Sequence, residues 1–294
     1  MIVLSVFTCF SSPRASAEER IDCLAGEGKA ERKLSGFLIQ VSPAPDKNID
    51  RGLCRAIIRT AEGKIVFQVR DHSITINDAT GGPISGDGKP DLVIEGDSGG
   101  AHCCSTYWIV SLENPPTLLR TIYNEVPVWF RDLNEDGRLE ILTYDGAFDY
   151  FDGMSHSHSP FPLVVLRLNG RQLDRVNAEY WHLYEKEISE ARSKLSGECA
   201  KLFRLGQSHF NGNDRGCDWE ETKKQILIVV LDNLYGGHEG EAWKILAEDW
   251  PPGDLMRIRK LILDTANKSF LGDTRRASFG GNEWPSKDPR SEKR

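Results

Sequence analysis

The chain has no apolar run long enough to cross a membrane and no surplus of basic residues. Its longest apolar stretch, residues 226–231, is far shorter than the roughly 20 residues that a spanning helix needs. The net charge is −7 over 294 residues, whereas non-specific nucleic-acid binding needs a concentrated basic face. The chain also lacks the spaced cysteine or histidine pairs that hold zinc. Its composition therefore predicts a soluble protein, long enough for two domains, that binds no nucleic acid.

The N-terminus resembles an export signal, although no positively charged segment precedes it. Residues 1–10 form an apolar stretch, and Ala15-Ser16-Ala17 matches an A-x-A cleavage site. We therefore expect residues 1–17 to be a cleaved signal peptide and the mature protein to be periplasmic or secreted. A lipoprotein anchored through Cys9 and a structural N-terminus are the alternatives.

Cleavage after Ala17 would leave six cysteines, an even number that suits disulfides in an oxidising compartment. Proximity in the sequence favours two bridges, Cys23 with Cys54 and Cys199 with Cys217. Each would close a loop that adds about 3 kcal/mol of stability in the chain-entropy model. Reduced, buried cysteines are the alternative, because a free cysteine packs as a small hydrophobic residue.

Short strands are expected in the first part of the chain. Apolar and β-branched runs alternate there with Gly, Pro and Asp, and Asn169-Gly170 is typical of a hairpin turn. We expect strands at 37–41, 54–58, 64–69, 73–76, 92–94, 107–112, 126–130, 140–144 and 163–168. The pattern predicts a β-repeat domain over residues 18–173.

After Leu173 the spacing of apolar residues changes to three and four, which is typical of amphipathic helices. We expect helices at 176–195, 220–235, 239–249 and 254–270. They would form a small antiparallel helical domain over residues 174–271, and the polar residues 272–294 predict a disordered tail. The expected fold class is α+β and multidomain, with the β-repeat domain first.

Two acidic loops are the clearest functional signal. Residues 132–140 place acidic or amide side chains at loop positions 1, 3, 5 and 9 and glycine at position 6, so that alternate side chains can converge on one hard cation. An imperfect copy contains Asp78, Asp87 and Asp91 around the glycine-rich insertion 81–86. Each copy runs into a short strand, and the copies lie about 50 residues apart, the size of a four-stranded β-repeat.

The second loop resembles the calcium loops of FG-GAP and VCBS repeats, the β-propeller blades also found in integrin α subunits. The resemblance covers roughly residues 60–170 and is carried by Asp132, Asn134, Asp136, Gly137 and Glu140, followed by the strand at 141–142. It implies blade-like sheets and a structural calcium ion.

By this resemblance, four side chains and one backbone carbonyl would bind the ion: those of Asp132, Asn134, Asp136 and Glu140, and the carbonyl of Arg138. The family usually has aspartate where this chain has Glu140. In the first loop, Asp78, Asp87 and Asp91 would meet around a second ion if the insertion bulges out. The alternative is an Asp/Asn/Gly turn that caps itself through side-chain-to-backbone bonds and holds no metal.

A hydrolase is the competing interpretation. Residues 96–100 read Gly-Asp-Ser-Gly-Gly, as in the nucleophile segment of trypsin-like serine proteases, but only His72 precedes Ser98 in the mature chain. A patch formed by His102, Cys103 and Cys104 offers a second candidate nucleophile or metal site, and His156 and His158 would share one face of an extended segment.

The sequence favours an exported, non-enzymatic binding protein and assigns no catalytic residue. In this interpretation a calcium-stabilised β-repeat domain is joined to a helical domain that contacts a protein or a cell-surface component. The alternative is a hydrolase that uses Ser98 or the His102/Cys103/Cys104 patch. A third possibility is a scaffold with vestigial repeats.

Overall fold

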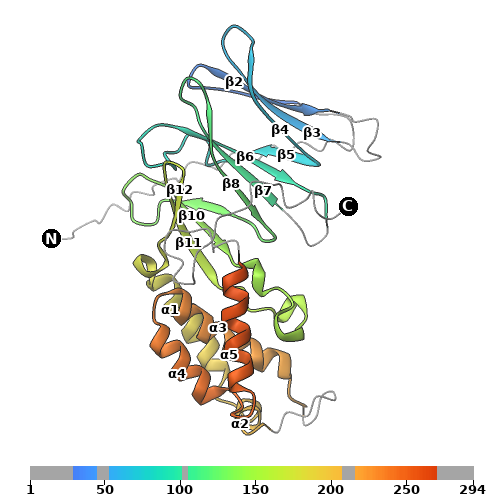
Figure 1. The fold of residues 1–294 in the computed structure, drawn as a ribbon, viewed down its shortest axis with the longest axis vertical. Coiled ribbons are helices and arrows are strands. Elements are labelled where there is room, and N and C mark those ends of the chain that lie inside the picture. Colours follow the sequence, from blue (N-terminus) through green and yellow to red (C-terminus); the bar gives the residue numbers. More distant parts are fainter. Residues whose placement is uncertain (1–28, 45–52, 101–104, 207–215, 270–294) are drawn as a thin grey trace, which may run out of the picture.

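The computed structural model describes residues 29–44, 53–100, 105–206 and 216–269. In these residues three antiparallel four-stranded sheets come first in the chain and five α-helices follow, without a closed barrel. The sheets are stacked along the long axis of the molecule, and the helices lie at the end next to the third sheet (Figure 1).

Each sheet is a meander whose strands pair in chain order. The first consists of β1 (Ala30–Leu34), β2 (Phe37–Pro43), β3 (Cys54–Arg59) and β4 (Ile65–Asp71). The second consists of β5 (Ser73–Ile76), β6 (Asp91–Asp97), β7 (Ser105–Ser111) and β8 (Thr117–Asn124). The third consists of β9 (Trp129–Arg131), β10 (Glu140–Tyr144), β11 (Leu163–Asn169) and β12 (Gln172–Arg175).

The two acidic loops occupy the same position in consecutive sheets. The first joins β5 to β6 and the second joins β9 to β10, so each connects the first and second strands of its meander. Asp91 begins β6 and Glu140 begins β10, and both side chains are buried. In the first sheet the same connection is only the turn at Ser35 and Gly36.

The second sheet is buried on both faces because it lies between the other two sheets. Leu92 and Ile94 of β6 pack in the core shared with the first sheet, whereas Val93 packs in the core shared with the third sheet and the helices. Side chains alternate between the faces of a strand. This explains why the run 92–94 is apolar throughout rather than alternating.

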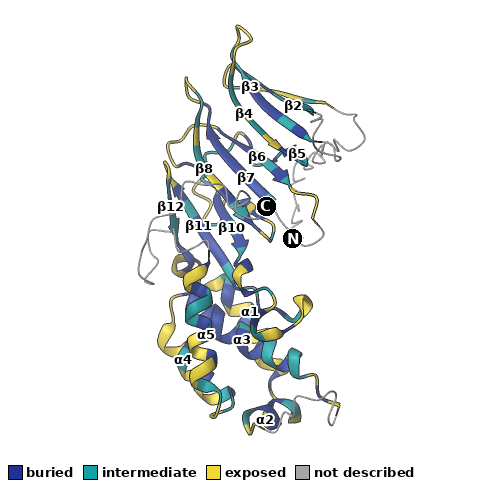
Figure 2. Ribbon diagram, turned by 45° about the vertical axis from the view of Figure 1, so that its right-hand side comes forward, coloured by how far each residue is buried: buried dark blue, intermediate teal, exposed yellow. Residues whose placement is uncertain are grey.

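The helices are α1 (His182–Lys194), α2 (Glu198–Arg204), α3 (Trp219–Tyr235), α4 (Glu239–Asp249) and α5 (Leu255–Lys268). α3 is central and buried over most of its length (Figure 2). None of the helices in the described ranges is long and apolar enough to span a membrane.

One hydrophobic core joins the second and third sheets to the helices. The connecting loop 145–162, between β10 and β11, contributes Phe148, Phe151 and Met154 to this core. From the same loop, Asp152 forms ion pairs with Lys223 of α3 (2.9 Å) and Arg257 of α5 (2.6 Å). The expected boundary at residue 173 is thus crossed by a continuous core.

Most of the expected elements are present, with several differences in the described part. Strands β1 and β8 and helix α2 were not expected, and β12 was expected only as the partner strand that the hairpin turn at 169–170 implies. The expected helix at 176–195 is instead a 3₁₀ turn at Asn177–Tyr180 followed by α1. The strand expected at 126–130 is the short β9 at Trp129–Arg131.

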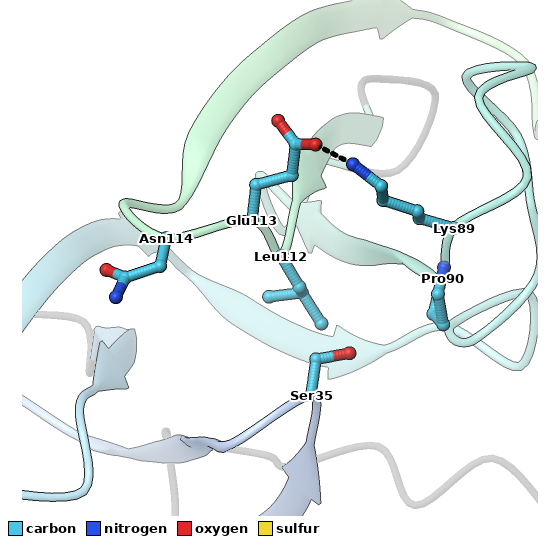
Figure 3. A pocket seen from close by; sticks show the side chains of 6 residues that line it. All are labelled: Ser35, Lys89, Pro90, Leu112, Glu113 and Asn114. Carbon is cyan, nitrogen blue, oxygen red and sulfur yellow. Dashed lines mark hydrogen bonds and ion pairs between the residues drawn. The ribbon is translucent and has the colours of Figure 1, made fainter.

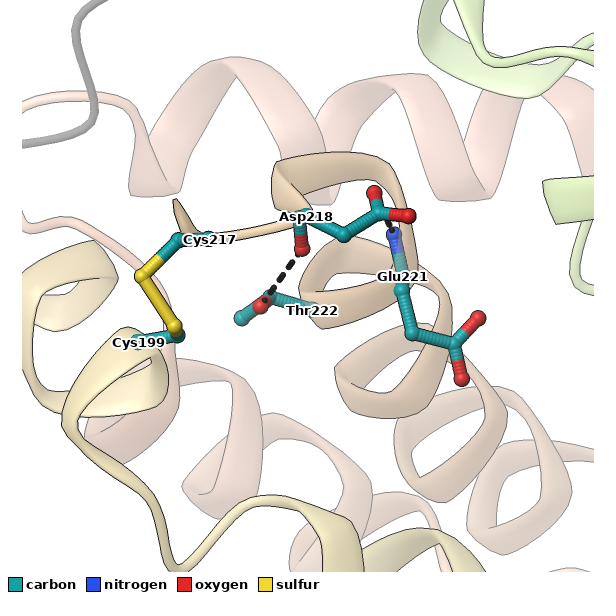
Figure 4. Close-up of a disulfide and its surroundings, with 5 residues drawn as sticks. All are labelled: Cys199, Cys217, Asp218, Glu221 and Thr222. Carbon is teal, nitrogen blue, oxygen red and sulfur yellow. Dashed lines mark hydrogen bonds between the residues drawn. A yellow bond between two sulfur atoms is a disulfide. The ribbon is translucent and has the colours of Figure 1, made fainter. Parts of the chain in front are cut away.

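The structure confirms the bridge between Cys199 and Cys217, whose Cα atoms are 5.5 Å apart (Figure 4). It ties α2 to the start of α3, where the Asp218 carboxylate accepts a hydrogen bond from the Glu221 N–H at 3.0 Å and so caps the helix. Cys54 is also disulfide-bonded, but Cys23 lies outside the described residues. So do the expected signal peptide, Cys103, Cys104 and the expected tail.

Candidate functional site

The second acidic loop is a series of turns held by its own side chains. Asp132 accepts hydrogen bonds from the N–H groups of Asp136 (3.1 Å) and Gly137 (2.9 Å). Asp136 in turn accepts the Arg138 N–H at 2.8 Å. Gly137 has a φ of +86°, a left-handed conformation that glycine adopts without steric cost. The loop therefore has the self-capping geometry of Asx turns.

Three of the predicted ligands lie together in this loop. The Asn134 amide donates to the Asp136 carboxylate at 2.9 Å, and Asp132 reaches the same turn through its bond to the Asp136 N–H. The hydrogen bond from Arg138 and that from Asn134 lower the pKa of Asp136. Asp132, Asn134 and Asp136 thus offer exposed oxygen atoms in one turn, as a hard cation requires.

Glu140 does not join these three side chains in the same way. Its carboxylate is fully buried and accepts the Leu133 N–H at 3.2 Å. It also forms an ion pair with Arg167 at 3.2 Å, and Arg167 continues to Glu179 at 2.8 Å. The charge of Glu140 is therefore compensated by a guanidinium group, which leaves three of the predicted ligands in the outer turn of the loop.

The first loop gathers fewer of its predicted ligands. Asp78 and Asp87 are exposed, whereas Asp91 is 1% exposed and accepts the N–H groups of Ile84 (2.9 Å) and Ser85 (2.7 Å). Burial raises the pKa of Asp91. Asp87 accepts the Ser85 hydroxyl at 3.2 Å. Asp87 and Asp91 are therefore linked through Ser85, whereas Asp78 forms no hydrogen bond with either of them in the described part of the chain.

The glycine-rich insertion packs against the second loop instead of bulging away from it. A Cβ atom on Gly82 would lie 2.5 Å from Leu139, and one on Gly86 would lie 2.6 Å from the Arg138 guanidinium carbon. The Arg138 side chain donates hydrogen bonds to the Leu168 carbonyl and to the Asn169 side chain. The insertion thus brings the two acidic loops into contact, which the linear sequence did not reveal.

Within the described ranges, no three His, Cys, Asp or Glu side chains are grouped so that they could hold a metal ion. This agrees with the second loop, which offers two carboxylates and an amide in its outer turn. Any cation there would depend on Asn134 and on backbone oxygens as well.

No family model, curated protein or solved structure matches the chain. The resemblance of residues 132–140 to FG-GAP and VCBS calcium loops thus rests on the residues themselves.

Two open cavities lie at the sheet edge that carries the acidic loops. The first, of about 510 Å³, is lined by side chains from the first two sheets, with Lys89 and Glu113 paired across it and Leu112 and Pro90 beside them (Figure 3). The second, of about 390 Å³, also includes Glu113 and extends to the β11–β12 turn at Gly170. The loop ends of all three sheets thus border a shallow, open surface.

The residues of the hydrolase alternative lie near one another but are not hydrogen-bonded as a triad. The His72 imidazole lies over Gly99, where a Cβ atom would be 2.4 Å from its ring. Asp71 accepts the backbone N–H of His72 at 2.8 Å, and within the described residues the His72 ring makes no hydrogen bond. Ser98 is exposed. His102, Cys103 and Cys104 lie outside the described residues.

His156 and His158 lie on a 3₁₀ turn rather than an extended segment, and each meets a different carboxylate. His156 Nδ1 is 2.8 Å from Asp149, and His158 Nδ1 is 3.0 Å from Glu220 at the start of α3. Sequence reasoning missed both acidic partners: Glu220 is more than 60 residues away along the chain, and Asp149 is close in sequence but meets His156 only because of the 3₁₀ turn. The contacts join the connecting loop 145–162 to α3.

Proposed function

We propose that this chain is an exported, non-enzymatic binding protein whose blade-like β-repeats are stabilised by calcium at the second acidic loop. The observation that carries the proposal is the placement of both acidic loops between the first and second strands of consecutive meanders. Equivalent loops in equivalent sheets are what a repeat with a cation loop requires. The helical part is proposed to contact a protein or a cell-surface component.

Asp132, Asn134 and Asp136 would hold the ion in the second loop, because their oxygens already lie in one turn. Backbone N–H groups fix these carboxylates, so little ordering is left to occur on binding. A bound calcium ion would supply positive charge to this turn. It would stabilise the folded state in proportion to the logarithm of its concentration relative to its dissociation constant.

Glu140 would hold the loop in position from its buried side. Its ion pair with Arg167 and its bond to the Leu133 N–H tie the loop to β11 and to the end of β9. The glutamate would therefore act on the geometry of the outer turn rather than bind the ion directly.

Calorimetry of the full chain with added calcium and with EDTA tests the proposal. We expect calcium to raise the melting temperature and Asp136→Asn to abolish this response, since the asparagine retains the hydrogen bond to Arg138 but loses the charge. Asp78→Asn removes the same charge from the first loop and serves as the control that keeps the response. Purified protein that contains no calcium and melts at the same temperature in EDTA would refute the calcium part.

The non-enzymatic part is tested with a fluorophosphonate probe, which reacts with activated serines. We expect no labelling of Ser98, whose exposed side chain receives no hydrogen bond from His72 in the described part. Labelling that disappears on denaturation and in His72→Ala would favour the hydrolase.

A further inference from the structure

The outer face of the first sheet has no second layer of sheet or helix on it in the described structure. This sheet lies at the end of the stack, opposite the helices (Figure 1). Phe37, Ile39 and Ala56 point toward the second sheet and form the core between the two sheets. The residues that alternate with them therefore point outward.

Two arginines stand directly opposite each other on this face. Arg55 of β3 pairs in register with Arg70 of β4. Like charges at opposed positions of neighbouring strands are destabilising. Within the described residues no acidic side chain pairs with either arginine, and the Arg55 Nε atom is buried without a hydrogen-bond partner. A site that takes an anion between them would explain this arrangement.

The positive charge continues along the same face. Two positions from Arg55, Ile57 lies in register with Gln40 and Gln68. Two positions further, Arg59 lies opposite Leu38, which is opposite Lys33. Lys33, Arg55, Arg59 and Arg70 thus form a basic face, and the row between them consists of Glu31, Gln40, Ile57 and Gln68. Glu31 is paired with Lys29 and accepts a hydrogen bond from Gln40 at 2.6 Å.

The exposed groups of the basic face are polar except at its margin, where Ile65, in register with Arg59, is 40% exposed. Ile57 at its centre is only 3% exposed, and Leu38 is partly buried. Gln68 and Arg70 are exposed, and the Arg59 guanidinium is held by Gln40 at 3.0 Å and by the Gly63 carbonyl at 3.0 Å. The face therefore presents guanidinium groups on either side of the Gln68 amide.

We propose that the basic face binds a linear acidic polysaccharide. Guanidinium groups bind carboxylate and sulfate groups with two parallel hydrogen bonds, and amide side chains donate to and accept from sugar hydroxyls. The exposed Gln68 amide between Arg70 and the more distant Arg59 suits a chain that carries hydroxyl groups between its acidic groups. This assignment rests on the proposed role at a cell surface and names the chemistry of the partner.

The same observations argue against two other polyanions. Single-stranded nucleic acid is bound through aromatic side chains on which bases stack, and the rows of the basic face contain none. Anionic bilayers attract basic surfaces, but they offer no sugar-hydroxyl chemistry for the central glutamines. Binding to single-stranded nucleic acid and binding to anionic bilayers are therefore both measured in the experiment.

The test is binding of the full chain, at low salt, to immobilised polygalacturonate and chondroitin sulfate, with neutral dextran as the blank. We expect Arg55→Gln/Arg70→Gln to bind both acidic polymers at least about tenfold more weakly, because two charge-assisted contacts are lost. The control Arg171→Gln/Lys268→Gln changes the net charge equally at exposed positions elsewhere and should bind like the native chain.

Several results would overturn the proposal: no binding to either acidic polymer, an equal loss in both double variants, or tighter binding to phosphatidylglycerol vesicles or single-stranded DNA. If the double variant fails to fold, Arg70→Gln alone tests the same pair, since Arg70 is exposed. The calcium response of the double variant is measured in parallel, to separate this proposal from the calcium proposal.

If Arg55→Gln/Arg70→Gln loses polymer binding but keeps its calcium response, the result supports the basic face as the binding site. Absence of the calcium response with polymer binding intact refutes only the calcium proposal.

Discussion

At the scale of single residues, contact between the acidic loops depends on glycine residues of the first loop, which leave room for larger side chains of the second loop. Arg138 lies against Gly86 and bonds to the β11–β12 turn, and Leu139 lies against Gly82. Gly170 donates a backbone hydrogen bond to the Ser85 carbonyl at 2.9 Å at the same place. The insertion that interrupts the first acidic loop thus has a packing role.

Gly86→Ala tests this contact. The new Cβ atom would displace the Arg138 guanidinium and weaken its bonds to Leu168 and Asn169, at a cost of about 1–2 kcal/mol. Gly88→Ala is a matched control, since Gly88 has a φ of +77°, close to the +80° of Gly86, and no atom within 4 Å of the added carbon. Urea unfolding should show a lower stability for Gly86→Ala than for Gly88→Ala. Equal losses would mean that only backbone strain matters.

Burial also shapes the ionisation of a carboxyl group between α1 and α3. Asp232 is 2% exposed, and its Oδ2 atom has no hydrogen-bond partner in the described structure. Burial raises the pKa of Asp232 well above its ordinary value, and the nearby Glu187 adds to the effect. The folded state therefore binds this proton more tightly than the unfolded state does, so stability falls as the pH rises from about 3.8 through the folded pKa.

Asp232→Asn is expected to raise the melting temperature at pH 7.5 by about 2 °C or more, because it removes the cost of ionising a buried carboxyl. The gain should shrink as the pH falls toward 4, where the native carboxyl is already neutral. Asp78→Asn, at an exposed position, should show no such pH dependence. A gain that is the same at both pH values would contradict the ionisation argument.

At the scale of elements, the sequence was most informative where a strand is buried. β5 and β10 have the predicted bounds, and the strand predicted at 92–94 is confirmed as part of β6. The unexpected β1 is an edge strand with the sequence Ala-Glu-Arg-Lys-Leu, whose charges hide the strand pattern. Edge strands carry such charges because these discourage further pairing.

The acidic loop could be found from spacing, but its supporting residues could not. Asp132, Asn134 and Asp136 lie within five residues, whereas Arg167 reaches Glu140 from 27 residues away. Pairing of Ile141 with Leu166 brings these two residues together across β10 and β11. Such a contact depends on strand register, which local composition does not encode.

The disulfide between Cys199 and Cys217 belongs to this scale because it anchors α2. A helix of seven residues is too short to be stable alone. Replacing both cysteines with serine should lower the free energy of unfolding by about 3 kcal/mol, through the loss of a loop closed over 18 residues. Urea unfolding of the double variant measures the loss without reducing the bond at Cys54. A change below about 0.5 kcal/mol would mean that packing alone holds α2.

At the scale of the whole molecule, the two ends of the sheet stack have different surroundings. The first sheet ends in a polar, basic face, as a terminal repeat needs for solubility. The third sheet instead continues into the helices through one core, to which Phe148 and Phe151 of the connecting loop contribute. Tyr184 of α1 donates to the Leu163 carbonyl at 2.9 Å, and Tyr235 of α3 donates to Asp145 at 2.5 Å.

A chain that ends at residue 175 is therefore expected not to fold, although it retains all twelve described strands. Removing the helices would expose Phe148, Phe151 and the core side of the third sheet to water and leave the buried Asp145 carboxyl without Tyr235. The fragment should bind a hydrophobic dye and show no cooperative melting, whereas the full chain should melt in one transition that includes the helices. Cooperative melting of the fragment near the temperature of the full chain would show instead that the sheets form an independent domain.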